Sequence, residues 1–155
     1  MNFAEFHAGQ VLTQGPVRVT EADIVAFAKA YDPQWFHTDP ARADAGRWQG
    51  LIASGWHTCS IAMRLVCEGP LSGSESIGSP GLAYLKWPAP VRPGDELMLE
   101  ANVLETRTSR SGRVGSLRWR WQLFNQRREE VLDTEVTSLF ELRPGQESAD
   151  EGGSG

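Results

Sequence analysis

Hydrophobic and polar positions follow two different periods along the 155-residue chain. Up to about residue 70, apolar residues recur with helical spacing in three segments, whereas from residue 81 onward they alternate as in strands with one buried face. Partial alternation in Gln10–Val19 predicts one early strand. Three helices followed by a strand meander predict an α+β domain rather than an alternating α/β one.

The predicted helices carry recognisable start and stop signals. Thr20 can cap the first helix, and Pro33 ends it because the residue before a proline is pushed out of helical geometry. A capping side chain followed by proline predicts a short second helix over 39–46. The third helix is predicted over 54–69, and its few polar positions indicate that other structure encloses it.

Four strands are predicted after the helices, within 81–91, 95–108, 112–125 and 130–142. Pro88 and Pro90 are expected to mark a bulge or a sheet edge, because proline cannot donate to a sheet ladder. The architecture that fits is an antiparallel sheet curled around one long buried helix. Residues 1–142 are therefore expected to form a single domain, and residues 143–155, which have little to bury, a flexible tail.

Composition removes several classes of function. The hydrophobic share of 40% and the charged share of 23% are those of a globular protein, so disorder is not expected. A net charge of -5 disfavours nonspecific nucleic-acid binding. The apolar runs are too short to span a bilayer, and the N-terminus lacks the features of a signal peptide. We therefore expect a cytoplasmic protein without a nucleic-acid or membrane partner.

Other chemistries lack the parts that they need. The three histidines share no metal-type spacing with each other or with the cysteines, so no metal is expected. Cys59 and Cys67 lie about 12 Å apart along a helix axis, which is too far for a disulfide, and are predicted to be packed thiols. The arginines of 107–128 alternate with apolar residues, and a sheet with one packed face explains this better than nucleic-acid binding.

The segment 31–40, YDPQWFHTDP, is the first candidate site. It places Asp32 and His37 five residues apart in a stretch that two prolines stiffen and two aromatic residues can shield from water. A plain turn, with the aspartate capping it and the histidine exposed, explains the same residues. Held side by side in a partly dry pocket, however, a carboxylate and an imidazole can share one water and act as an acid–base pair.

The second candidate site is the start of the third helix, in LIASGWHT at 51–58. Free N–H groups and the helix dipole favour negative charge there, and glycine allows another molecule to approach the backbone. Ser54 and Gly55 are therefore candidates for an oxyanion or substrate-binding site. Ordinary helix capping accounts for them equally well.

Three segments, YDPQWFHTDP, LIASGWHT and WPAPVRPGDEL, together resemble the MaoC-like dehydratases, or (R)-specific enoyl-CoA hydratases, of the hotdog fold. The resemblance covers roughly residues 5–142. In that family, the aspartate and histidine of the motif D-x-N-P-[aliphatic]-H form the catalytic pair, which implies this role for Asp32 and His37. Gln34 and Trp35 depart from the motif's asparagine and proline. Ser54-Gly55 stands for the frequent His-Gly pair and keeps the glycine whose N–H would bind the thioester oxygen.

The resemblance implies a reversible addition of water to a trans-2-enoyl thioester, which gives an (R)-3-hydroxyacyl thioester. It further implies a CoA or acyl carrier protein substrate, no separate cofactor, and a homodimer or a higher even assembly. Further candidate pocket residues are Gln34, Trp35, Phe36, Trp56 and His57, although simple packing on the helix is favoured for His57.

Two alternatives stay open. A hotdog thioesterase would be expected to place a carboxylate on or next to the central helix, whereas the only acid of the predicted helix, Glu68, stands at its far end. A noncatalytic acyl-CoA-binding module is favoured by the departures at Gln34 and Trp35. A free-thiol assay separates a thioesterase from a hydratase, because hydration releases no thiol.

Overall fold

The computed structural model describes residues 1–143, so the predicted tail lies outside the described residues from position 144 onward. The first half of the chain contains η1 (Phe3–Glu5), β1 (Val11–Arg18), α1 (Glu21–Tyr31), α2 (Trp35–Thr38), α3 (Pro40–Asp44) and α4 (Gly55–Glu68). The second half contains β2 (Ser76–Lys86), β3 (Glu96–Thr108), β4 (Val114–Phe124) and β5 (Glu130–Glu141). Among residues 1–143, no helix combines the length and the apolar character needed to cross a membrane.

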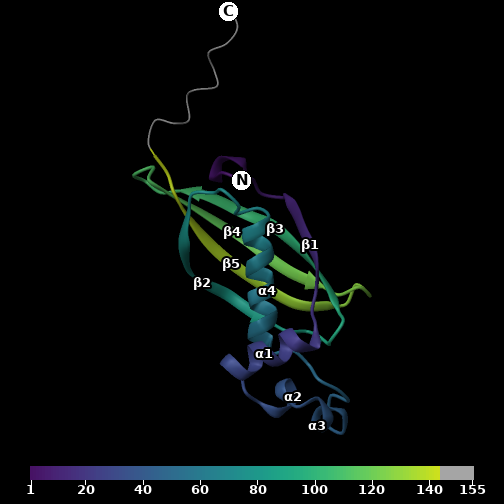
Figure 1. Cartoon of the computed structure of the whole chain (residues 1–155). Coiled ribbons are helices and arrows are strands. Elements are labelled where there is room, and N and C mark those ends of the chain that lie inside the picture. The colour runs from purple at the N-terminus through teal and green to yellow at the C-terminus, as the bar shows by residue number, and fades with distance from the viewer. Residues whose placement is uncertain (144–155) are drawn as a thin grey trace, which may run out of the picture.

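The five strands form one sheet in the order β1-β3-β4-β5-β2, with every neighbouring pair antiparallel. The sheet curls around α4, and the shorter helices α1, α2 and α3 gather at one end of α4 (Figure 1). β1 and β2 are the two edge strands. This arrangement confirms the predicted α+β architecture of a sheet around one long helix.

The core lies between α4 and the inner face of the sheet. Along β4, buried and half-buried residues alternate, as the arginine-rich segment predicted. The inward residues Leu117, Trp119 and Leu123 are fully buried, and the Trp119 indole N–H donates to Ser138 Oγ at 3.1 Å. On the outer face, Arg120 forms two 2.9 Å hydrogen bonds with Asp133. The arginines of this strand therefore serve the sheet itself.

Local start signals act as predicted. The Thr20 hydroxyl accepts from Asp23 N at 3.1 Å, and the Asp23 carboxylate accepts in turn from Thr20 N. Asp39 caps α3 in the same way by accepting from Arg42 N at 3.1 Å. Two elements were not predicted. They are η1 near the N-terminus and α2, a single turn that fits between the two prolines of the YDPQWFHTDP segment.

Two predictions about the second half require correction. Pro88 and Pro90 lie beyond the end of β2 at Lys86, so they mark neither a bulge nor an edge position within a strand. β2 also begins five residues earlier than its predicted start at residue 81, and its pairing with β5 contains register shifts near Gly78 and Gly81. These irregularities break the period-two pattern that a strand prediction uses.

The enclosure of α4 was also predicted incorrectly. Its inner face is buried, but Trp56 is 58% exposed and Met63 is 41% exposed. Cys59 is half-buried as a packed thiol would be, whereas Cys67 is exposed, and both are free. The sheet of one chain covers only part of the helix.

Replacing Thr20 with alanine should lower the free energy of unfolding, because the N–H of Asp23 loses its acceptor. Loss of such a cap costs about 1 kcal/mol. Urea denaturation followed by circular dichroism measures the difference. Thr108→Ala, at an exposed strand end, is the matched control and should change the free energy by less than about 0.5 kcal/mol. Equal losses in both variants would contradict a specific capping role.

Candidate active site

Asp32 and His37 lie next to each other at the end of α4 that the short helices surround. Asp32 follows the last residue of α1, and His37 is on α2. The turn between the two helices folds back so that His37 Nε2 lies 3.3 Å from Asp32 Oδ2. The imidazole is buried, and the carboxylate is largely buried. The structure thus brings together the two residues that the sequence had suggested as a pair.

Hydrogen bonding determines the tautomer of the His37 imidazole. Nδ1 lies 2.7 Å from the carbonyl oxygen of Ile52, and a carbonyl can only accept, so Nδ1 carries a proton. Nε2 is therefore the nitrogen that gains or loses a proton, and it faces Asp32. The ring of Phe36 packs edge-on against the imidazole with centroids 4.3 Å apart. The ring plane and the protonation site are both held in place.

Asp32 accepts hydrogen bonds at both carboxylate oxygens. Gln34 Nε2 donates to Oδ1 at 2.7 Å, and Ser54 Oγ donates to Oδ2 at 2.7 Å. Burial alone would raise the pKa of Asp32, but the hydrogen bonds from Gln34 and Ser54 and the charge of His37 together outweigh it and lower the pKa. Asp32 is therefore an oriented, ionised carboxylate at neutral pH. Gln34, a departure from the family motif, supplies one of the two donors.

The two residues at the start of α4 have different surroundings. The Ser54 hydroxyl donates to Asp32 and accepts from Trp56 N at 3.3 Å, so its hydrogen bonds hold the carboxylate and cap the helix. The oxyanion or substrate contact expected for Ser54 stays a prediction. Among residues 1–143, no hydrogen bond uses the N–H of Gly55, the first residue of the helix. That N–H is available to an external acceptor.

The remaining predicted pocket residues divide by position. Trp35 packs edge-on against Phe36, and the guanidinium of Arg42 lies 4.4 Å from the centroid of the Trp35 ring. His57 stacks on Phe27 of α1 with centroids 4.7 Å apart. Burial lowers the pKa of His57, although the charge of Asp23 opposes this. His57 therefore packs between α1 and α4, the role that was favoured for it.

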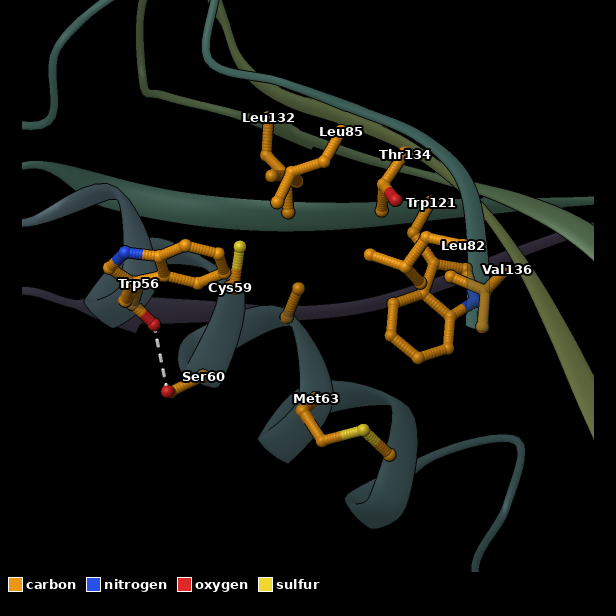
Figure 2. Close-up of a pocket in the computed structure, with 11 residues that line it drawn as sticks. Trp56, Cys59, Ser60, Met63, Leu82, Leu85, Trp121, Leu132, Thr134 and Val136 are labelled. Atoms are coloured by element: carbon orange, nitrogen blue, oxygen red, sulfur yellow. Dashed lines mark hydrogen bonds between the residues drawn. The ribbon is translucent and has the colours of Figure 1, made fainter. Parts of the chain in front are cut away.

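An apolar cavity of about 330 Å³ lies between α4 and the strands β2, β4 and β5 (Figure 2). Trp56 lines it from the first turn of α4, together with Cys59 and Met63 farther along the helix. From the sheet, Leu82 and Leu132 complete much of the wall. Of these residues, the sequence suggested only Trp56 as a pocket residue. The three helix positions recur at helical spacing, but nothing local marks the strand residues that face them.

Comparison with known proteins agrees with this geometry. The MaoC-like domain family model matches residues 2–118. A solved MaoC-like dehydratase from Rhodospirillum rubrum is 36% identical with a TM-score of 0.78, over 91% of this chain and 97% of that one. The uncharacterized protein YdeM of Bacillus subtilis is 33% identical over 90% of this chain and 99% of its own length. The 3-hydroxyacyl-thioester dehydratase Z of Mycobacterium tuberculosis is 31% identical over 69% of this chain and 73% of its own length.

The matched region contains the α1–α2 segment, the start of α4 and most of the sheet. It therefore includes every residue that positions the Asp32–His37 pair. The alignments cover nearly the full length of the Rhodospirillum rubrum dehydratase and of YdeM. The chain belongs to the MaoC-like family of hotdog-fold proteins, whose kind of chemistry is that of dehydratases and hydratases.

Proposed function

We propose that this protein adds water reversibly across the double bond of a trans-2-enoyl-CoA to give an (R)-3-hydroxyacyl-CoA. The observation that supports this most directly is the 3.3 Å contact between His37 Nε2 and Asp32 Oδ2. Ser54, which donates to Asp32, directly precedes Gly55, whose N–H forms no hydrogen bond within residues 1–143. The pair supplies acid–base chemistry, and the N–H supplies a donor for an anionic oxygen. The (R) configuration follows the resemblance to (R)-specific hydratases.

The start of α4 would activate the thioester. In this proposal the thioester oxygen accepts from Gly55 N–H, and the dipole of the 14-residue helix favours the negative charge that develops there. Such a charge arises on the oxygen when a nucleophile attacks C3 of the conjugated enoyl group. One preorganised oxyanion donor contributes about 3–4 kcal/mol to the transition state. In this proposal, Gly55 therefore provides the oxyanion-binding part of the site.

Asp32 and His37 would hold and deprotonate the attacking water. The water oxygen bonds to C3, one of its protons passes to the pair, and the pair delivers one proton to C2. The carbon–carbon double bond becomes a single bond, so the atoms balance without a cofactor. Because the Ile52 carbonyl keeps the proton on Nδ1, proton exchange on His37 takes place at Nε2, next to Asp32.

The geometry favours hydration over the two alternatives. The acid on α4 itself, Glu68, pairs with Arg64 at 2.8 Å in the last turn, far from Gly55. The carboxylate next to the helix, Asp32, faces His37 at 3.3 Å, which favours its use in an acid–base pair over thioester hydrolysis. The departures that suggested a noncatalytic module leave the acid–base pair intact. Gln34 donates to Asp32, and Trp35 packs on Phe36 and under Arg42.

Asp32→Asn and His37→Ala should each lower the turnover of crotonyl-CoA hydration by roughly two to four orders of magnitude, the range for loss of a positioned acid or base. Loss of enoyl absorbance measures the reaction, and a parallel free-thiol assay should remain blank. The exposed His7 provides the control His7→Ala, which should keep the parent rate. Parent-like hydration in both site variants, or thiol release by the parent, would overturn the proposal.

Ser54→Ala should raise the pKa of Asp32, because one of the two donors that lower it is lost. A carboxyl with a lowered folded pKa stabilises the fold above its ordinary pKa of 3.8, and this contribution is lost as the pH falls through the folded value. The variant should therefore be less stable at pH 7 and should lose less stability on acidification. Carboxyl carbon NMR gives the pKa, and urea denaturation gives the stability.

Ser60→Ala is the matched control, because the Ser60 hydroxyl donates to Trp56 O on the exposed side of the same helix. It should leave the titration of Asp32 unchanged. If Ser54→Ala left the pKa of Asp32 at its parent value, the hydrogen bond would not be what holds this carboxylate ionised.

We also propose that two copies of the chain associate through β2 and the outer side of α4. β2 is an edge strand, and almost all of its residues are exposed, including Ile77 and Leu82. Met63 of α4 is exposed as well, and it lines the cavity together with Leu82. A second copy would cover these apolar side chains and close the exposed side of the cavity.

Native mass spectrometry should therefore give a mass of twice 17.1 kDa or an even multiple of it. The double variant Ile77→Asp/Leu82→Asp should shift the protein to the single-chain mass, because it places charges on the proposed interface. Val11 is equally exposed on the opposite edge strand β1, so Val11→Asp should leave the assembly intact. A parent protein of single-chain mass would refute the association.

A further inference from the structure

Trp87 lies directly against the first residue of α4. It follows the last residue of β2 and stands 32 positions after Gly55 in the sequence. A Cβ built on Gly55 would come within 2.5 Å of one indole carbon and within 2.8 Å of two others. The indole therefore occupies the space of a side chain at position 55. Glycine is needed there because the ring rests on its α carbon.

The chain holds this indole in a defined place. Two prolines follow Trp87 and restrict the backbone, and Ala53 N donates to Val91 O at 2.8 Å. That hydrogen bond ties the segment 87–91 to the residues just before α4. The ring of Trp56 meets the indole edge-on, with centroids 5.5 Å apart. Trp87 is nevertheless 41% exposed, so part of its surface is free to contact a bound molecule.

Trp87 and Trp56 pack edge-on and form a wall that leads from Gly55 to the apolar cavity. Trp87 contacts Gly55, whose N–H is unpaired, while Trp56 contacts Trp87 and lines the apolar cavity. A thioester oxygen bonded to Gly55 N–H and an acyl tail in the cavity would place the first acyl carbons beside this wall. Pro88 and Pro90 restrict the backbone that carries the Trp87 part of this wall.

We infer that Trp87 is a specificity-determining residue that restricts the site to acyl thioesters without a substituent at C2. This inference rests on the proposed function, since it takes the thioester oxygen to lie at Gly55. C2 is bonded to the carbonyl carbon, so in this inference a branch at C2 is the acyl substituent nearest to the indole. Where a site has no space for it, a single methyl group changes binding by about 10- to 200-fold. The chemical class selected is the acyl-CoA that is unbranched at C2.

Binding of two saturated, unreactive ligands tests the inference without requiring turnover. Isothermal titration of the parent with butyryl-CoA and isobutyryl-CoA should show at least a tenfold preference for the unbranched acyl group. In Trp87→Leu the preference should fall below about threefold, mainly through tighter isobutyryl-CoA binding. Trp87→Phe keeps a ring at this position, provides a second variant if the leucine variant fails to fold, and should give an intermediate preference.

Trp48→Leu is the matched control, because Trp48 is also 41% exposed but lies in the loop before α4, whereas the atoms nearest to a Cβ at Gly55 all belong to Trp87. It should keep the parent preference. An unchanged preference in folded Trp87→Leu and Trp87→Phe, or equal binding of both ligands by the parent, would overturn the inference. Selective binding without hydration of crotonyl-CoA would refute the proposed reaction and leave the inference standing, whereas no binding of either ligand would refute both.

Discussion

The three residues that precede α4, from Ile52 to Ser54, connect the parts of the site. The carbonyl of Ile52 accepts from His37, and the hydroxyl of Ser54 donates to Asp32, both at 2.7 Å. The same short stretch leads into Gly55, which begins the helix. The acid–base pair and the helix terminus are thus connected by two hydrogen bonds, and neither can move far without the other. Precise positioning of this kind is what a reaction between a held water and a polarised thioester requires.

Partial burial of Asp32 disfavours its ionised form, and neighbouring hydrogen-bond donors offset this effect. Removing a carboxylate from water favours its neutral form, yet the net pKa of Asp32 is lowered. Gln34 and Ser54 each donate to one oxygen, and His37 adds positive charge when it is protonated. Although Gln34 departs from the asparagine of the family motif, it still donates a hydrogen bond to Asp32. The longer side chain still reaches the carboxylate two residues before it.

Local signals in the sequence were enough to predict where α1, α3 and α4 begin. The N-caps at Thr20, Asp39 and Ser54 bond to residues only two or three positions away. The proximity of Asp32 and His37 could be suggested for the same reason. The position of Trp87 could not, since its contact with Gly55 joins residues 32 positions apart through the fold of β2. Likewise, the cavity walls come from α4 and from strands that meet only in the folded sheet.

The wrong prediction that α4 is enclosed and the exposed apolar residues of the edge strand β2 have one physical origin. A mostly apolar helix pattern shows that water is excluded from the side chains, but it does not show whether the same chain, a second copy or a ligand excludes it. In this structure the sheet covers the inner face of α4 and leaves Trp56 and Met63 exposed beside the cavity. Exposed apolar surface of this extent is characteristic of a binding surface. The helix residues that the pattern predicted to be enclosed include those that, in our proposals, a second copy and the acyl chain would cover.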